Sequence, residues 1–149
     1  MTEGVFTISI AAPPEQVWPW VADLEKHHEW SPKPSRVEWV SGEPNRVGSR
    51  FHSVGAIPMD KDHDNEGEIT ERVERERFAL EAHDKEGDYR NVFELAAGPD
   101  GWTTLTHTLT FLKVNGMAAL MVPIVFPLVG KADIRKRMQL LKAKAESSG

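Results

Sequence analysis

Apolar and polar residues alternate through most of the chain, and this pattern predicts strands flanked by helices. Residues 4–11 alternate in the way typical of a strand with one buried face. Pro13 and Pro14 follow, and proline suits the first turn of a helix because its missing N–H costs nothing there. We therefore expect a short helix after this strand and a second short helical turn over residues 23–30.

The middle of the chain, from residue 36 to residue 111, has the two-residue period of strands. Turn clusters such as residues 85–88 and 98–101 separate its apolar segments, and no helical pattern intervenes. This arrangement predicts an antiparallel meander of about six strands. The expected strands begin near Arg36 and then cover residues 48–55, 66–73, 77–82, 89–96 and 102–113.

The C-terminal segment from Lys131 to Glu146 has the period of an amphipathic helix. Its apolar residues recur at steps of three and four with basic residues between them, so one stripe must pack on another surface. We expect the sheet to supply that surface and function to reside between sheet and helix. The stripe consists of Ile134, Met138, Leu141 and Ala145.

The preceding apolar run, Met117 to Val129, does not fit a regular helix, because it contains Pro123 and Pro127. It is shorter than the roughly 20 apolar residues that a transmembrane helix needs. We therefore expect no stable membrane insertion and interpret the run as core, a portal or an adjustable lid.

Composition narrows the function classes. A chain of 149 residues fits one domain, residues 1–149, and its formal charge of −5 does not favour a nucleic-acid partner. Without cysteine it has no disulfide framework and no thiolate nucleophile, and residues 1–10 lack the pattern of a secretory signal. We expect a cytoplasmic protein with no cofactor; the oligomeric state is left open.

The order strand, two short helices, strands and C-terminal helix carries a resemblance. Together with the segments ISIAAPPEQVWPWVADLEKHHEW, VGSRF, EITERVERERFALEA and GWTTLTHTLTF, it resembles the polyketide cyclase/dehydrase and lipid-transport superfamily. This SRPBCC superfamily includes START domains and the birch-pollen-allergen family. The resemblance implies an α+β helix-grip fold, in which a curved, seven-stranded antiparallel sheet wraps around the C-terminal helix and encloses an apolar cavity.

His107 is the most distinctive polar residue in the predicted sheet. Alternation places it on the same face as Leu105, Leu109 and Phe111, so it points either into the core or into a cavity. A strand phase shifted by one residue would replace it with threonines. The expected ligand-binding residues are Trp30, Phe51, Ser53, Phe78, Tyr89, Asn91, Phe93, His107, Leu109, Met117, Met121 and Met138.

No metal site is expected. The acidic stretch of residues 60–71 has carboxylates at some positions of a calcium loop, but Asn65 stands where the sharp turn needs glycine. We interpret the stretch, including His63, as a solvated loop between strands. The remaining histidines do not show the local spacing of a zinc site.

Three functions remain open at this stage. The first is binding or transport of one hydrophobic or amphipathic small molecule. The second is a polyketide cyclase/dehydrase-type enzyme with His107 as acid/base and Tyr89, Ser53 or Asn91 as donors. The third is a chaperone-associated or other protein-binding module that docks its partner on Met117–Val129. There is no hydrolase, kinase or dinucleotide-binding motif.

Overall fold

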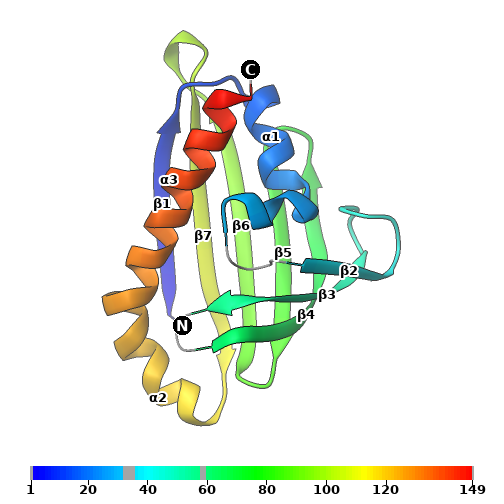
Figure 1. The fold of residues 1–149 in the computed structure, drawn as a ribbon, viewed down its shortest axis with the longest axis vertical. Coiled ribbons are helices and arrows are strands. Elements are labelled where there is room, and N and C mark those ends of the chain that lie inside the picture. The colour runs from blue at the N-terminus through cyan, green and yellow to red at the C-terminus, as the bar shows by residue number, and fades with distance from the viewer. Residues whose placement is uncertain (1, 32–35, 58–59, 149) are drawn as a thin grey trace.

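A computed structural model describes residues 2–31, 36–57 and 60–148, and its centre is one seven-stranded antiparallel sheet (Figure 1). The strand order is β1-β7-β6-β5-β4-β3-β2. In chain order the elements are β1 (Glu3–Ile10), α1 (Pro14–Ala22), the 3-10 helix η1 (Leu24–Glu29), β2 (Arg36–Ser41), β3 (Arg50–Ile57), β4 (Asp60–Val73), β5 (Arg77–Asp84), β6 (Gly87–Ala97), the 3-10 turn η2 (Pro99–Gly101), β7 (Thr103–Val114), α2 (Gly116–Val125), the π-helical turn η3 (Phe126–Gly130) and α3 (Lys131–Ser147).

The strands form the predicted meander, and one long-range pairing adds β1 at its edge. Strands β2 to β7 follow one another across the sheet, and β1 pairs with the last of them, β7. Phe6 is the register partner of His107 in this pair. The expected α+β helix-grip architecture, with a seven-stranded sheet and a long C-terminal helix, is therefore confirmed.

Helix α3 lies along one face of the sheet, next to β1, and α1 packs against it (Figure 1). The four residues of its predicted stripe are all buried, with Leu141 and Ala145 fully inaccessible. Burial of each larger side chain contributes about 2 kcal/mol, which fixes the helix to the sheet.

The acidic stretch of residues 60–71 is not the loop that we interpreted it to be, whereas the strand predicted over residues 66–73 is confirmed. The acidic stretch forms most of β4, a 14-residue strand that pairs with β3 and β5. Polar residues alternate in it, so that His63 and Asn65 point inward and are buried while Asp64 points outward. Backbone hydrogen bonds to two neighbouring strands outweigh the polar composition.

The apolar run over residues 117–129 is also more regular than predicted. Pro123 lies within α2 and Pro127 within the π-helical turn, and the helix continues into α3. A π-helical turn changes the local hydrogen-bond pattern, which accommodates a residue without an N–H. Residues Gly116–Ser147 form one helical segment of 32 residues, and a window of it, with mean hydropathy 1.7, is long and apolar enough to cross a membrane. Soluble core helices pass the same test, but only 11% of this window is buried.

Candidate functional site

A cavity of about 560 Å³ lies between the sheet and the C-terminal helical segment. Strands β3 to β7 supply one wall, η1 and Trp30 a second, and α2, η3 and α3 the third. Its volume exceeds the roughly 300 Å³ at which small-molecule sites begin. The residues that we expected from the sequence and that line it are Trp30, Phe51, Ser53, Tyr89, Asn91, Phe93, His107, Leu109, Met117, Met121 and Met138.

Phe78 is the expected ligand-binding residue that the structure places elsewhere. Its side chain is fully buried in the hydrophobic core. Leu80, two residues further along the same face of β5, does line the cavity. Alternation predicts the face of a strand correctly, but it does not tell where along the strand the core ends and the cavity begins.

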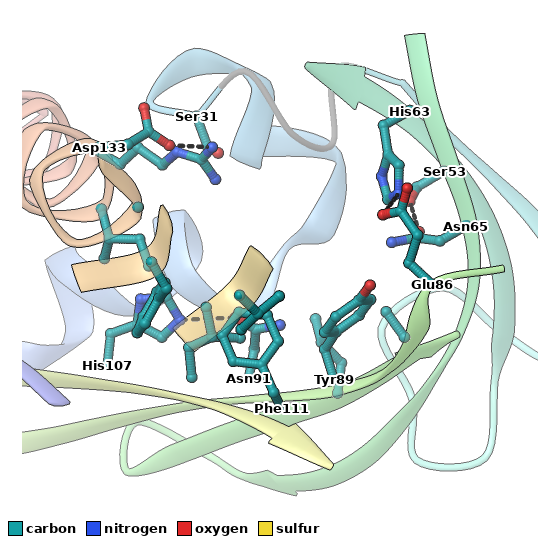
Figure 2. A pocket seen from close by; sticks show the side chains of 18 of the residues that line it. Ser31, Ser53, His63, Asn65, Glu86, Tyr89, Asn91, His107, Phe111 and Asp133 are labelled. Carbon is teal, nitrogen blue, oxygen red and sulfur yellow. Dashed lines mark hydrogen bonds and ion pairs between the residues drawn. The ribbon is translucent and has the colours of Figure 1, made fainter. Parts of the chain in front are cut away.

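His107 lies at one end of the cavity and is buried (Figure 2). Its Nε2 is 2.9 Å from Oδ1 of Asn91 on the neighbouring strand, and its ring stacks on Phe93 at 4.3 Å between centroids. Burial lowers its pKa to about 3, helped by the charges of His27 and Arg137. The imidazole is therefore neutral at neutral pH, its Nε2–H donates to Asn91, and it is a weak base.

His63 and Asp84 form a second polar group that the sequence analysis missed. The His63 Nε2 atom is 2.8 Å from Asp84 Oδ2 and 3.6 Å from Glu86 Oε2. The side chains of His63 and Asp84 are 5% and 3% exposed. Buried histidine–carboxylate pairs occur both at functional sites and as purely structural pairs.

The hairpin between β5 and β6 holds Asp84 in place. Asp84 Oδ1 accepts hydrogen bonds from the backbone N–H of Glu86 at 2.7 Å and of Gly87 at 3.1 Å. The Tyr89 hydroxyl donates to the same oxygen at 3.0 Å. Burial raises the pKa of Tyr89, and the Asp84 charge adds to this, so the phenol stays protonated. An aspartate that opens the turn Asp84-Lys85-Glu86-Gly87 is the sequence signal that could have identified this anchor.

Ser53 and Asn65 complete this polar end. Ser53 Oγ donates to Asn65 Oδ1 at 2.5 Å, across the β3–β4 pair. In Figure 2 both residues lie beside His63 and Glu86, and Tyr89 stands between this group and the His107–Asn91 pair. The cavity thus carries polar groups from several strands in a lining that is mainly apolar.

The ligating atoms of His63, Asp84 and Glu86 lie within 4.8 Å of one another, so these side chains could hold a divalent cation. The sequence predicted no metal site. His63 Nε2 and Asp84 Oδ2 also approach each other to 2.8 Å without an ion.

Arg137 is a charged residue in the cavity wall. The sequence pattern assigned it to the solvent-exposed face of the helix. Its Nη2 is 2.5 Å from Asp133 Oδ2, one turn away, and its side chain is 17% exposed. Burial lowers its pKa, against the opposing effect of Asp133. Its Nε is buried and has no hydrogen-bond partner among the described residues. An unpaired buried donor is costly, and an oxygen acceptor on a ligand would relieve that cost.

A curved antiparallel sheet packed around a long C-terminal helix defines the helix-grip class of α+β folds. Within that class, the family model for polyketide cyclase/dehydrase and lipid transport matches residues 1–146. The chain therefore belongs to this family.

Solved structures share the fold at low sequence identity. A conserved protein from Geobacillus kaustophilus is 18% identical, with a TM-score of 0.79 and coverage of 99% of this chain and 97% of that one. Protein TTHA0849 from Thermus thermophilus is 19% identical, with a TM-score of 0.75 and 99% coverage of both chains. DynU16 from the dynemicin biosynthetic locus is 16% identical, with a TM-score of 0.65; the match covers 97% of this chain and 47% of DynU16. A comparison with curated proteins gave no match.

Proposed function

We propose that this protein binds one hydrophobic or amphipathic small molecule in the cavity between the sheet and the C-terminal helix. The observation that carries the proposal is the cavity of about 560 Å³, which is mainly apolar and has separate polar groups in its wall. The family description, which includes lipid transport, supports the same function.

The polar groups suggest what the ligand carries. Arg137 offers a buried N–H without an acceptor among the described residues, so an oxygen acceptor, a carbonyl or a carboxylate, fits beside it. The apolar remainder of the ligand would lie along Leu109, Phe111 and Met138. Methionines at the wall adapt to different shapes, which favours a permissive site.

The test is native mass spectrometry of freshly purified protein, combined with thermal shift on a panel of fatty acids and aromatic polyketides. A Leu109→Trp variant fills the cavity and should lose both the retained ligand and the thermal shift. Thr106→Val, on the outer face of the same strand, is the matched control and should keep them. No retained molecule and no shift in the wild type would remove the basis for this function.

A second candidate, an enzyme of the cyclase/dehydrase type, is favoured by the His63–Asp84 pair. A general base needs a pKa near the operating pH, which His107, with its pKa of about 3, does not have. His63 lies in the cavity wall and is held by a carboxylate that is itself fixed by three donors. Under this hypothesis His63 is the acid/base and Tyr89 is a protonated donor.

A linear poly-β-ketone thioester distinguishes the two histidines. Under the enzyme hypothesis, mass spectrometry should show loss of water in the wild type and in His107→Gln, but not in His63→Gln. Loss of turnover in His107→Gln alone, with the ligand still bound, would instead assign the chemistry to His107. No turnover by the wild type would leave the binding function alone supported.

A further inference from the structure

The outer face of α2 and of the π-helical turn is apolar and exposed. Leu120, Ile124 and Leu128 are 68%, 58% and 73% exposed, and they are spaced four residues apart, so they form one stripe. Met117 extends the stripe at one end with 70% exposure. Water therefore contacts several large apolar side chains in a row, which is unusual for a free surface.

The inner face of the same segment is apolar as well. Ala118, Val122 and Val125 line the cavity, and Phe126 is buried below them. A helix that is hydrophobic all round is normally enclosed by protein or by lipid. Here protein encloses only the inner half in the part of the chain that the structure describes, so the outer half needs another apolar environment.

The charges next to this stripe indicate which environment. Residues 116–130 contain no charged side chain, and the helix then continues into Lys131, Arg135 and Lys136. Arg135 and Lys136 are exposed. The chain as a whole has a formal charge of −5, so this basic group stands out locally against an acidic molecule. An anionic surface would attract this end and repel the rest, which would orient the protein.

We propose that this docking surface, formed by Met117, Leu120, Ile124 and Leu128 with Lys131, Arg135 and Lys136, binds reversibly to an anionic lipid bilayer. The apolar side chains enter the boundary between headgroups and acyl chains, and the basic side chains contact phosphates. The contact is peripheral, because Ile134, Met138 and Leu141 hold α3 on the sheet.

Docking would place the wall of the cavity at the bilayer. A lipid could then enter past α2 without crossing water; this consequence, unlike docking itself, rests on the proposed ligand-binding function. Vesicle binding is measured without any added ligand, so either idea can fail while the other survives.

The test is vesicle flotation of the full chain. Two kinds of vesicle are used, one of phosphatidylcholine alone and one of equal parts phosphatidylcholine and phosphatidylglycerol. The wild type should float with the anionic vesicles, and added salt should weaken this binding. The triple variant Leu120→Gln/Ile124→Gln/Leu128→Gln should bind at least about tenfold more weakly, because the three side chains no longer gain from leaving water.

The matched control carries three equivalent substitutions elsewhere, Val5→Gln, Val40→Gln and Val47→Gln. These valines are 60%, 66% and 59% exposed and lie outside the docking surface. The control should bind as the wild type does, and circular dichroism should show that both variants fold. The proposal is overturned if the wild type binds neither vesicle, or if the docking-surface variant binds equally well. It is also overturned if sedimentation shows a wild-type dimer that this variant dissociates, since a second copy would then cover the surface.

Discussion

His63 Nε2 lies 2.8 Å from Asp84 Oδ2, both side chains are almost completely buried, and His63 lines the cavity. Another histidine–aspartate pair, His83 and Asp88, lies on the β5–β6 hairpin that carries Asp84. This pair is at the surface, where the two side chains are 71% and 38% exposed. These two pairs have the same chemistry and differ mainly in burial.

These two pairs give the first prediction. Asp84→Ala should lower the free energy of unfolding by about 3 kcal/mol or more, because it leaves the Tyr89 hydroxyl, two backbone N–H groups and His63 without this acceptor. Asp88→Ala should cost at most about 1 kcal/mol, since exposed pairs contribute little. Urea unfolding of both variants measures the difference. Equal costs would show that the buried pair does not anchor the hairpin.

The second prediction concerns pH. Burial is the main cause that lowers the pKa of His27 to about 4 and of His107 to about 3, while both ionise near 6.5 when unfolded. As the pH falls, the unfolded state therefore takes up protons before the folded state does. Each histidine thus lowers the free energy of unfolding as the pH falls from about 6.5 towards the pKa of that histidine in the folded state. Between pH 7 and pH 5 we expect each to account for about 2 kcal/mol.

Urea unfolding of His27→Gln and His107→Gln at pH 7 and pH 5 tests this. Each variant should lose a smaller part of its stability over this interval than the wild type does. Phe93→Leu serves as control, because it removes the ring that packs edge-on against His27 and stacks on His107 but removes no titrating group. If both glutamine variants lose as much stability between pH 7 and pH 5 as the wild type does, the assigned pKa values are contradicted.

The third prediction follows from Gly67 on β4. Phe51 is its register partner on β3, and a Cβ added at Gly67 would overlap the Phe51 ring. Gly67→Ala should therefore cost about 1–3 kcal/mol through forced displacement of that ring. In a Phe51→Leu background the same substitution should cost less, and a double-mutant cycle measures this coupling. Strict additivity would mean that the ring does not occupy this position.

The fourth prediction concerns Arg137. Arg137→Met keeps much of the length of the side chain but removes the buried donor, so affinity for dodecanoate should fall at least about tenfold, the loss of one charge-assisted hydrogen bond. Lys136→Met removes the same charge from the exposed neighbouring position and should leave the affinity unchanged. Isothermal titration calorimetry compares them. If both variants bind alike, Arg137 does not contact the ligand.

The sequence pattern predicted the architecture well because the apolar residues of each stripe repeat with the period of one kind of element, either a helix or a strand. The stripe from Ile134 to Ala145 and the alternation around His107 both placed their residues on the correct face. The pattern failed where polar residues point inward. His63 and Asn65 alternate as a strand does, but their composition resembles a loop, and only pairing with β3 and β5 makes them strand.

The sequence predicted which residues of a single strand or helix line the site, but not the contacts between elements. Tyr89, Asn91 and His107 were found because they interrupt an apolar face. Asp84 was missed because its partners come from the hairpin turn and from His63 on β4. Arg137 was missed because its burial depends on how α3 packs beside the cavity. Contacts of this kind are set by packing, which local periodicity does not describe.

The most direct test of the central claim, that the cavity binds an apolar ligand, is methyl NMR of protein labelled with 13C at methionine. Met121 and Met138 line the cavity, and Met138 is 3% exposed. On titration with dodecanoate we predict chemical-shift changes and intermolecular NOEs at both methyl groups, and their loss in Leu109→Trp. Binding that leaves the Met138 methyl unchanged, or no binding by any member of the fatty-acid and polyketide panel, would contradict the account.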